Sequence, residues 1–427
     1  VSEVLPVTVD TSSTKALGQL NVTNAGIRIS NPNELKTLED NANKAKDFAL
    51  SSDIDLEESG ITWAGPSGYK GHFYGNGYTI KLALSKANGN TGLFTTVEGG
   101  AYIQDFTLDV SLADAAKTRN GSTYFGGVVG YIQTTASSSI NLKNIKVKGN
   151  LPFTGTTASL NSPNYFLVGG LVGEIKIATG GVVIANCASE LTATVGDYQW
   201  NASGTNHVCG FGGLIGRIGT TSNATLNVDI SDCYAVGTIS VKGASQHSRM
   251  FAGGLVGDIY ATNGTTNVAI TNCYSAGVVS AENTHTTAAR SDYVLGAGGL
   301  VGSVWKNGGT AVNATIQNSA AVGEKAVAVM TNVTVGIFPN SRFAGVGTGG
   351  LAPTSTTFSD NIARKGMIVG VNTEAADDSE GAANDPDAAG TELTALQQAS
   401  TWTTTLSWST DTWDFSGLPN KWPTLKK

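Results

Sequence analysis

Short segments of this chain alternate apolar with polar residues, and turns rich in Gly, Asn, Ser and Thr separate them. Residues 225–230 read Thr-Leu-Asn-Val-Asp-Ile, and residues 266–270 read Thr-Asn-Val-Ala-Ile. A period of two residues predicts β-strands that bury one face. Residues 92–330 contain no run with a convincing helical period, so the pattern predicts an all-β body. Short strands of this kind form a sandwich, a propeller or a solenoid.

A phrase of two glycines, two aliphatic residues and a third glycine occurs five times, with steps of 43, 43, 41 and 45 residues. Its copies begin at Gly126, Gly169, Gly212, Gly253 and Gly298. A fixed period of this size predicts stacked structural units. We expect the aliphatic pair to fill the interior. The paired glycines would permit a positive φ or a close approach of neighbouring backbone.

A second signal follows each glycine phrase by 17 to 20 residues: an Asn or Asp, with an apolar residue two places before it. These positions are Asn144, Asn186, Asp232, Asn272 and Asn318, with a weaker early copy at Asp105. Stacked amides at equivalent positions can hydrogen-bond along a ladder. The recurrence therefore favours the solenoid and predicts a parallel β-helix. Because roughly 20 residues suffice for one turn of short strands, we expect about two turns per unit.

Three of the four cysteines, Cys187, Cys233 and Cys273, occupy the same position in successive units. If units lie two coils apart, their Cα atoms are about 9–10 Å from each other, beyond the roughly 7 Å limit for a disulfide. This spacing predicts a column of free, buried thiols. We expect no metal site, because the chain has no Cys-x-x-Cys pair and no His at ligand spacing.

The two ends depart from the repeat. Asn31 as N-cap, Pro32 in the first turn and Glu34 predict a helix over about 32–42. We therefore divide the chain into a lead-in and cap (1–90), a solenoid (91–370) and an acidic loop with a C-terminal cap (371–427). Residues 374–390 are expected to form an exposed loop, followed by a short helix over about 391–399.

The last residues are aromatic: Trp402, Trp408, Trp413, Phe415 and Trp422. They would suit a platform that stacks on carbohydrate. A hydrophobic cap over the end of the stack is the favoured interpretation, because open coils expose unpaired strand edges.

Charge and motifs exclude several functions. The net charge is −7 with only 14% charged residues, and no basic stripe indicates a nucleic-acid partner. No apolar run is long enough to predict a transmembrane helix. His-Glu-x-x-His is absent, and the carboxylates are scattered through the unit. We expect no enzyme and no cofactor. The alternative, a carbohydrate-active β-helix enzyme, would need two or three carboxylates on one face.

The segments before the glycine phrases vary in length and carry long polar and aromatic side chains; one of them ends at Tyr165. Insertions in repeat proteins gather on one face, which is often the binding face. A ridge of this kind could engage a glycan by ring stacking or a protein by aromatic and Arg anchors. Ordinary solvated loops are the favoured interpretation of these segments. The candidate binding residues are Tyr198, Trp200, His247, Arg249, Arg290 and Tyr293.

The two phrases together, Gly-Gly-Leu-Val-Gly and Asn-Cys-Tyr-Ser-Ala-Gly at residues 272–277, resemble the GLUG motif of bacterial surface proteins. The lead-in and the ending Trp413-Asp414-Phe415 resemble those of the same proteins, so the likeness spans about residues 27–427. It implies a right-handed β-helix in a cell-adhesion protein of the Bacteroidetes type. Departures from the motif are Val128, Ile145, Leu191 and Ser319, and residues 340–370 follow it poorly.

The resemblance implies an extracellular protein of the bacterial cell surface, lipid-anchored or otherwise exported. Its function would be non-catalytic adhesion or binding to a glycan or a host protein, and we expect a monomer. The alternatives are the β-helix enzyme and a structural stalk of the cell envelope. The resemblance does not identify a ligand.

Overall fold

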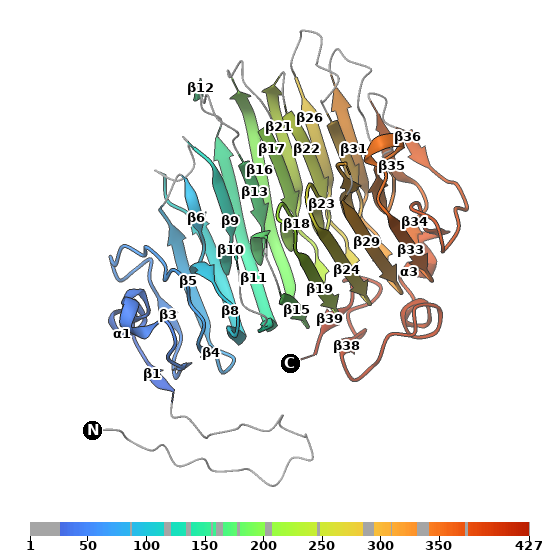
Figure 1. Ribbon diagram of the computed structural model, residues 1–427. Helices are drawn as coiled ribbons and strands as arrows, with labels where there is room; N and C mark the ends of the chain where they lie inside the picture. Colours follow the sequence, from blue (N-terminus) through green and yellow to red (C-terminus); the bar gives the residue numbers. More distant parts are fainter. Residues whose placement is uncertain are drawn as a thin grey trace.

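The computed structural model describes residues 26–85, 88–114, 121–133, 138–154, 157–158, 165–176, 180–200, 207–245, 248–284, 294–308, 310–330, 341–371 and 375–426. Within them, the chain is mostly β and coils repeatedly through three parallel sheets (Figure 1). The all-β prediction is confirmed.

Two smaller sheets lie on either side of the glycine phrases. The six-stranded sheet contains β6 (Gly89–Thr91), β9 (Thr123–Gly126), β13 (Tyr165–Gly169), β17 (His207–Gly212), β22 (Ser248–Gly253) and β27 (Val294–Gly298). The seven-stranded sheet contains β7 (Phe94–Val97), β10 (Val129–Ile132), β14 (Val172–Ile175), β18 (Ile215–Thr220), β23 (Val256–Ala261), β28 (Val301–Lys306) and β32 (Ala344–Val346). Each glycine phrase therefore turns the chain from the first sheet into the second.

A long, 24-stranded sheet holds most of the remaining strands and is parallel except for β36, which pairs antiparallel with β35. Its early members are β1 (Ile27–Ile29), β2 (Phe48–Leu50), β3 (Ile54–Asp55), β4 (His72–Tyr74), β5 (Thr79–Leu84), β8 (Tyr102–Leu112), β11 (Ile140–Thr154), β12 (Thr157–Ala158), β15 (Gly180–Ala185) and β16 (Ala188–Trp200). The central ones are β19 (Thr225–Ser231), β20 (Tyr234–Ala235), β21 (Ile239–Ser245), β24 (Thr265–Thr271), β25 (Tyr274–Ser275), β26 (Val279–Asn283), β29 (Ala311–Gln317), β30 (Ala320–Ala321) and β31 (Lys325–Met330). The last are β33 (Ser355–Ser359), β34 (Ile362–Arg364), β35 (Met367–Val371), β36 (Ala375–Asp377) and β37 (Ala389–Thr391).

Each repeat makes a single coil, so the prediction of two turns per unit is wrong. Gly212 pairs in register with Gly253, one repeat further along the chain. The strands are longer than the prediction assumed: β11 has 15 residues and β16 has 13, and this length completes one wide turn.

The cysteine column is correspondingly tighter than predicted. Because equivalent residues on neighbouring coils lie about 4.8 Å apart, the predicted separation of 9–10 Å is wrong. The backbone N–H of Cys187 donates to Sγ of Cys233, with a distance of 3.4 Å between N and S. All four cysteines are buried and free, which confirms the predicted column of buried thiols at Cys187, Cys233 and Cys273.

The Asn and Asp column is confirmed as a structural ladder. Its members adopt a positive φ of 49° to 63°, the left-handed conformation that Asn and Asp tolerate best. Nδ2 of Asn144 donates to Oδ1 of Asp105 at 2.7 Å, and Nδ2 of Asn272 donates to Oδ1 of Asp232 at 3.2 Å. The column therefore fixes the corner at which the long sheet bends.

The glycine phrase works by close approach of backbone. A Cβ added at Gly213 would lie 2.2 Å from the carbonyl oxygen of Gly254 on the next coil. Equivalent clashes recur at Gly127, Gly170, Gly254 and Gly299. This confirms close approach, one of the two roles predicted for the paired glycines.

One apolar core runs through the coil from Ile29 to Ala388, and β1 to β5 already belong to the long sheet. The predicted boundaries near residues 90 and 370 stay a prediction. The expected helix at 32–42 consists of α1 (Pro32–Lys36) and two 3-10 turns, Thr37–Glu39 and Asn41–Asn43. Asn31 is its N-cap, as predicted, and Leu35 is fully buried in the core.

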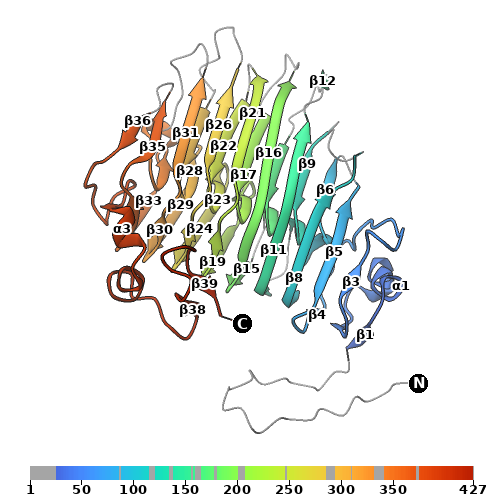
Figure 2. The same ribbon diagram turned by 180° about the vertical axis from the view of Figure 1, so that it is seen from behind.

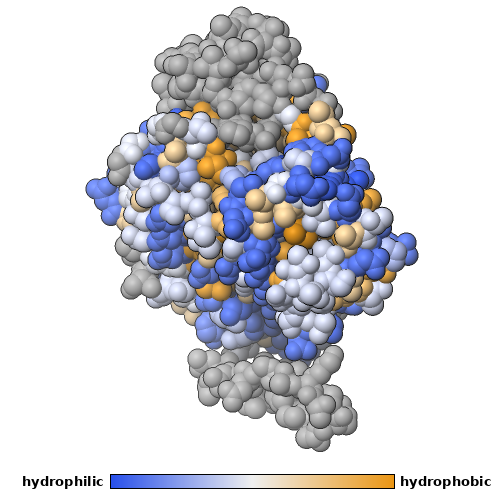
Figure 3. All heavy atoms as spheres, turned by 90° about the vertical axis from the view of Figure 1, so that its right-hand side faces the viewer, coloured by the Kyte–Doolittle hydropathy of each residue, from blue (hydrophilic) through white to orange (hydrophobic). Residues whose placement is uncertain are grey.

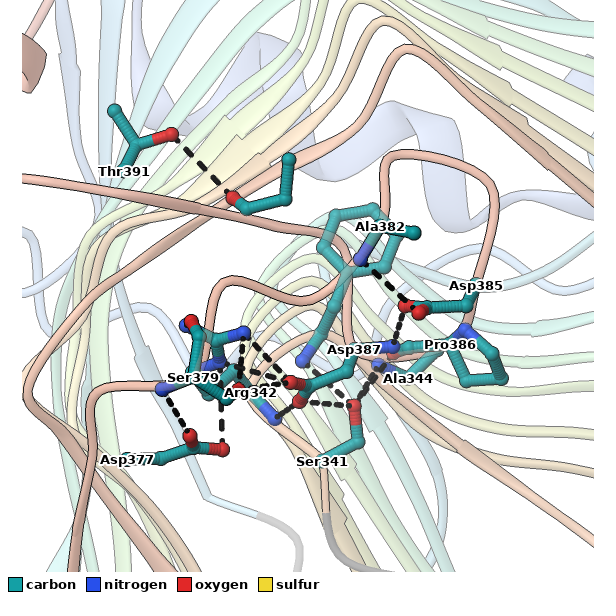
Figure 4. A network of polar contacts seen from close by, with 12 residues as sticks. Ser341, Arg342, Ala344, Asp377, Ser379, Ala382, Asp385, Pro386, Asp387 and Thr391 are labelled. Atoms are coloured by element: carbon teal, nitrogen blue, oxygen red, sulfur yellow. Dashed lines mark hydrogen bonds and ion pairs between the residues drawn. The ribbon is translucent and has the colours of Figure 1, made fainter.

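Polar contacts close the last coil, and they involve the segment predicted to be an exposed loop. Arg342 is fully buried, and its Nη2 lies 2.6 Å from Oδ2 of Asp387. Its Nη1 donates to the backbone oxygen of Ser379 at 3.0 Å (Figure 4). Part of residues 374–390 therefore anchors the last coil through contacts with a buried side chain. Viewed onto this end, much of the described surface is hydrophilic, with apolar patches between (Figure 3).

The aromatic C-terminal segment (393–426) lies along the flank of the stack, not across its end as predicted. It contains α3 (Leu393–Leu396), a π-helical turn (Thr401–Thr405) and the antiparallel pair β38 (Trp413–Asp414) and β39 (Thr424–Leu425). A further 3-10 turn, Gly349–Leu351, lies earlier in the chain. Both ribbon views place β38 and β39 beside β19 and β24 (Figures 1 and 2). Trp402, Trp408 and Trp413 cover an outward column, which consists of Ala188, Tyr234, Tyr274, Ala320 and Ile362.

Candidate binding site

The predicted binding ridge falls largely outside the described residues. Tyr198 and Trp200 lie near the end of β16, but nothing is described of their side chains. His247, Arg290 and Tyr293 lie outside the described ranges. These five residues therefore stay a prediction.

Arg249, the sixth candidate, lies in β22 and is partly buried. Its guanidinium carbon is 4.6 Å from the centroid of the Trp305 ring, a distance at which a cation is attracted to an aromatic face. The structure thus brings Arg249 to the outer angle between the six- and seven-stranded sheets. None of the other predicted residues is described at this place.

The outer faces of these two sheets meet because the glycine phrase bends the chain sharply. Side chains that would otherwise face solvent pack against each other there, as Phe251 and Val294 of one sheet do with Tyr260 and Trp305 of the other. All four are buried. This small cluster therefore lies outside the main core, apart from the cluster under the C-terminal tryptophans. The rest of the site lies around it.

A column of ionisable side chains runs along the seven-stranded sheet in this angle. Glu174, Arg217 and Asp258 occupy the same position on three successive coils and are 2%, 3% and 0% exposed. Nε of Arg217 donates to Oδ2 of Asp258 at 2.9 Å, and its Nη1 lies 3.9 Å from Oε1 of Glu174. The guanidinium carbon is also 3.4 Å from the Tyr260 ring centroid. Arg217 is thus held on three sides.

Burial dominates the electrostatics of the two acids. Desolvation raises the pKa of Glu174 and of Asp258, although the charge of Arg217 opposes this in both. Oδ1 of Asp258 also accepts hydrogen bonds from Ser303 Oγ at 2.5 Å and from Trp305 Nε1 at 2.7 Å. These carboxylates are enclosed and bonded, so they do not form the open pair that glycoside hydrolysis requires.

Three partly exposed tyrosines lie at the N-terminal side of this column. We call Tyr124, Tyr131 and Tyr165 the tyrosine cluster. The Tyr124 and Tyr165 rings are stacked, with centroids 5.9 Å apart and planes at 27°. The Tyr131 ring meets Tyr124 edge-on at 5.3 Å. Since Tyr131 pairs directly with Glu174 in the sheet, the cluster continues the ionisable column toward the N-terminus.

The surroundings favour the neutral form of Tyr124 and Tyr131 and support the ring of Tyr165. Desolvation, followed by the charge of Glu174, raises the pKa of Tyr124 and Tyr131. The guanidinium of Arg217 lies 5.7 Å from the Tyr165 ring centroid and supports that ring from the next coil. Partly exposed aromatic faces with hydroxyl groups can stack on the apolar face of a sugar and hydrogen-bond to its edge. This arrangement is suited to binding and contains no nucleophile paired with a base.

Sequence reasoning missed Tyr124 and Tyr131 and included Tyr165 only as the end of one ridge segment. The available signal was their position: Tyr124 and Tyr131 flank the first glycine phrase on its two sides. A turn at that phrase brings both rings to the same outer angle.

Comparison with known proteins adds little. No protein-family model matches the chain, and no curated protein matches it. A crystal structure described as a "putative immunoglobulin A1 protease" from Bacteroides ovatus aligns over 94% of this chain and 92% of that one, with a TM-score of 0.48 and 16% identity. Likeness at this level assigns neither a family nor an activity. Among the described residues, no helix has the length and apolar character to cross a membrane.

Proposed function

We propose that this chain is a non-catalytic binding protein of the bacterial cell surface, whose stacked coils form a right-handed parallel β-helix with a helical N-terminal cap. Its ligand is a glycan, bound at the tyrosine cluster. The observation that carries this proposal is the stacked and edge-on packing of three partly exposed tyrosines beside a fixed column of ionisable side chains.

Rigidity supports the proposal. Each ring of the tyrosine cluster belongs to or borders a β-strand, paired on neighbouring coils. A preformed site loses little conformational entropy when it binds, so a modest contact area can still give useful affinity. Aromatic rings offer large contact area on the non-polar face of a sugar, which favours a glycan over a small polar metabolite.

The surface location and the adhesion role rest on the resemblance of the repeat to the GLUG motif. An antibody against the folded chain should label intact cells of the source bacterium. Labelling only after lysis would contradict the surface location while leaving the binding proposal open to its own test.

The binding test is a glycan array probed with the purified chain, followed by calorimetry with the best glycan. Tyr124→Ala and Tyr165→Ala should each weaken binding by about tenfold, because each removes one stacking face. Tyr124→Phe should retain most of the affinity if the ring contributes most. Tyr78→Ala, immediately before β5 of the long sheet, is the matched control and should bind this glycan as the wild type does.

The proposal fails if the folded chain binds no glycan, or if both alanine variants bind normally. Binding to deglycosylated host proteins with loss in Tyr124→Ala would instead assign the cluster to a protein partner. Absence of every ligand would favour the structural stalk.

A further inference from the structure

A second feature that could bind a ligand lies at the N-terminal end, on a different sheet from the tyrosine cluster. An open depression of about 430 Å³ lies beside the first coils. Its lining comes from the start of β1, the segment before β2 and the start of β4, and consists of Ile27, Ala45, Lys46, Asp47, Lys70, Gly71 and His72.

The charge of this depression is opposite in sign to that of the whole chain. Lys46 and Lys70 are exposed at its edge, in a protein of net charge −7. Within the described ranges, neither lysine forms an ion pair. Asp47 is the acid in the lining, and its carboxylate is already engaged: Oδ1 accepts from the backbone N–H of His72 at 2.9 Å, and Oδ2 is 3.7 Å from Nδ1 of that residue.

Two tyrosines lie next to His72, at the edge of the depression. The hydroxyl of Tyr74 lies 3.1 Å from Nδ1 of His72, and the Tyr102 ring centroid lies 5.8 Å from that of His72. Both tyrosines are partly exposed. Nζ of Lys143, from β11, is 5.6 Å from the Tyr102 ring centroid. A third cation thus stands next to the aromatic side of the depression.

The rim is held by buried contacts. The hydroxyl of Tyr69 lies 3.0 Å from the carbonyl oxygen of Lys46 and 2.8 Å from that of His72, which ties the two sides of the depression together. A Cβ at Gly71 would fall 2.1 Å from the same oxygen of Lys46, so glycine is needed for this close approach. The lysines therefore extend from a fixed backbone.

We propose that this depression binds a sugar residue that carries a carboxylate. Lys46 and Lys70 hold the carboxylate, since ammonium groups with no ion-pair partner attract an anion. Tyr74 and Tyr102 contact the ring of the sugar, and His72 hydrogen-bonds to its hydroxyl groups. This site is separate from the tyrosine cluster and does not depend on the function proposed for it.

The test is calorimetry of the full chain with α-1,4-linked trigalacturonic acid and with a neutral galactose trisaccharide. The acidic probe should bind at least tenfold more tightly than the neutral one, and its affinity should fall as salt is raised. The double variant Lys46→Glu/Lys70→Glu should lose at least tenfold. A double variant Lys46→Gln/Lys70→Gln should show an intermediate loss.

The double variant Lys421→Glu/Lys426→Glu is the charge-matched control, because both are exposed lysines of the C-terminal segment. It should bind trigalacturonic acid normally. Equal affinity for acidic and neutral probes, no binding of the acidic probe, or an unchanged lysine double variant would each overturn the proposal. A sulfated trisaccharide that binds more tightly than the uronate would overturn the choice of carboxylate. Tyr124→Ala should leave uronate binding intact, which separates failure here from failure at the tyrosine cluster.

Discussion

Two columns of side chains in the same repeat behave in opposite ways. The inward column contains Ile145, Cys187, Cys233, Cys273 and Ser319, which are all buried and mostly small. The outward column on the seven-stranded sheet contains Tyr131, Glu174, Arg217, Asp258 and Ser303, and its chemistry changes at every coil. One column repeats and the other does not.

The difference follows from what each position contacts. An inward residue must fit an interior of the same shape on both neighbouring coils, so one solution recurs. An outward residue needs only a suitable partner above and below it, and Arg217 between two acids is one solution among many. The regular column identifies the fold, whereas candidate function gathers where the regularity ends.

The largest expected effect comes from a glycine that sets the repeat. In Gly254→Ala, the added Cβ would lie 2.0 Å from the carbonyl oxygen of Gly299 and 2.6 Å from Cβ of Ser275. Backbone cannot yield as a flexible side chain does, so we expect a loss of at least about 5 kcal/mol or failure to fold. Urea titration measures it. The control is Gly350→Ala, where no atom lies within 4 Å of the added Cβ, and a loss there as large as at Gly254 would contradict the steric explanation.

The next effect tests the outward column on the seven-stranded sheet. Arg217→Met should destabilise the chain by about 3–5 kcal/mol, because it leaves Glu174 and Asp258 buried without their cation. Thermal and urea unfolding measure the loss. Lys242→Met removes a similar cross-coil pair with Glu282, but those side chains are 40% and 34% exposed, so little change is expected. Equal losses in the two variants would mean that burial does not set the cost.

A smaller expected effect is on the pH dependence of stability. It compares an acid beside Arg217 with an acid beside Arg342, both of which are buried arginines. The folded-state pKa of Glu174 is raised, so its favourable contribution is present at low pH and is lost as pH rises through that value. The stability of the wild type relative to Glu174→Gln should therefore increase as pH falls from 7 toward the ordinary value near 4.5.

Asp387, which binds Arg342, should show the opposite sign. Burial opposes ionisation there, but the hydrogen bonds from Arg342 prevail and lower its pKa. Its contribution is present above the ordinary value of 3.8 and is lost as pH falls through the folded-state pKa. The advantage of the wild type over Asp387→Asn should thus shrink in acid. If the stability differences of Glu174→Gln and Asp387→Asn from the wild type change with pH in the same direction, the opposite pKa shifts assigned to Glu174 and Asp387 are refuted.

The smallest expected effect tests the inward column. Ser319 already occupies this column, and its Oγ donates to the carbonyl oxygen of Gln317 at 2.8 Å. Cys233 makes the same contact with Ser231, so Cys233→Ser should cost about 1 kcal/mol or less. Cys209→Ser should cost more, since its register neighbours are Phe166 and Met250. Similar melting temperatures for these two variants would contradict a column-specific tolerance.

The parts of the fold that recur could be predicted. Alternation identified strands such as β19 and β24, and the positions of Asn144 and Asn272 identified the ladder. The number of turns per unit could not be predicted, because alternation fixes the faces of a strand but not where it ends. β16 continues through residues that sequence reasoning placed in a surface ridge.

The site was predicted less well for a related reason. Tyr124 and Tyr131 are seven residues apart and gave no periodic signal, and they meet only because the chain turns at Gly126. The composition of the last residues showed that the tryptophans would be buried but not on which surface. Tyr274, whose hydroxyl donates to the carbonyl oxygen of Pro423 at 2.6 Å, is part of that surface and looks in sequence like any other repeat position.

The position of the C-terminal segment has a consequence for how the molecule comes apart. A stack in which each layer touches only its neighbours can unravel stepwise from an end. Here Trp413 reaches Asp232, 181 residues earlier, and its cluster touches five successive layers. The final layers cannot unfold separately while the C-terminal segment stays packed on them, so the second half of the stack should unfold in one cooperative event.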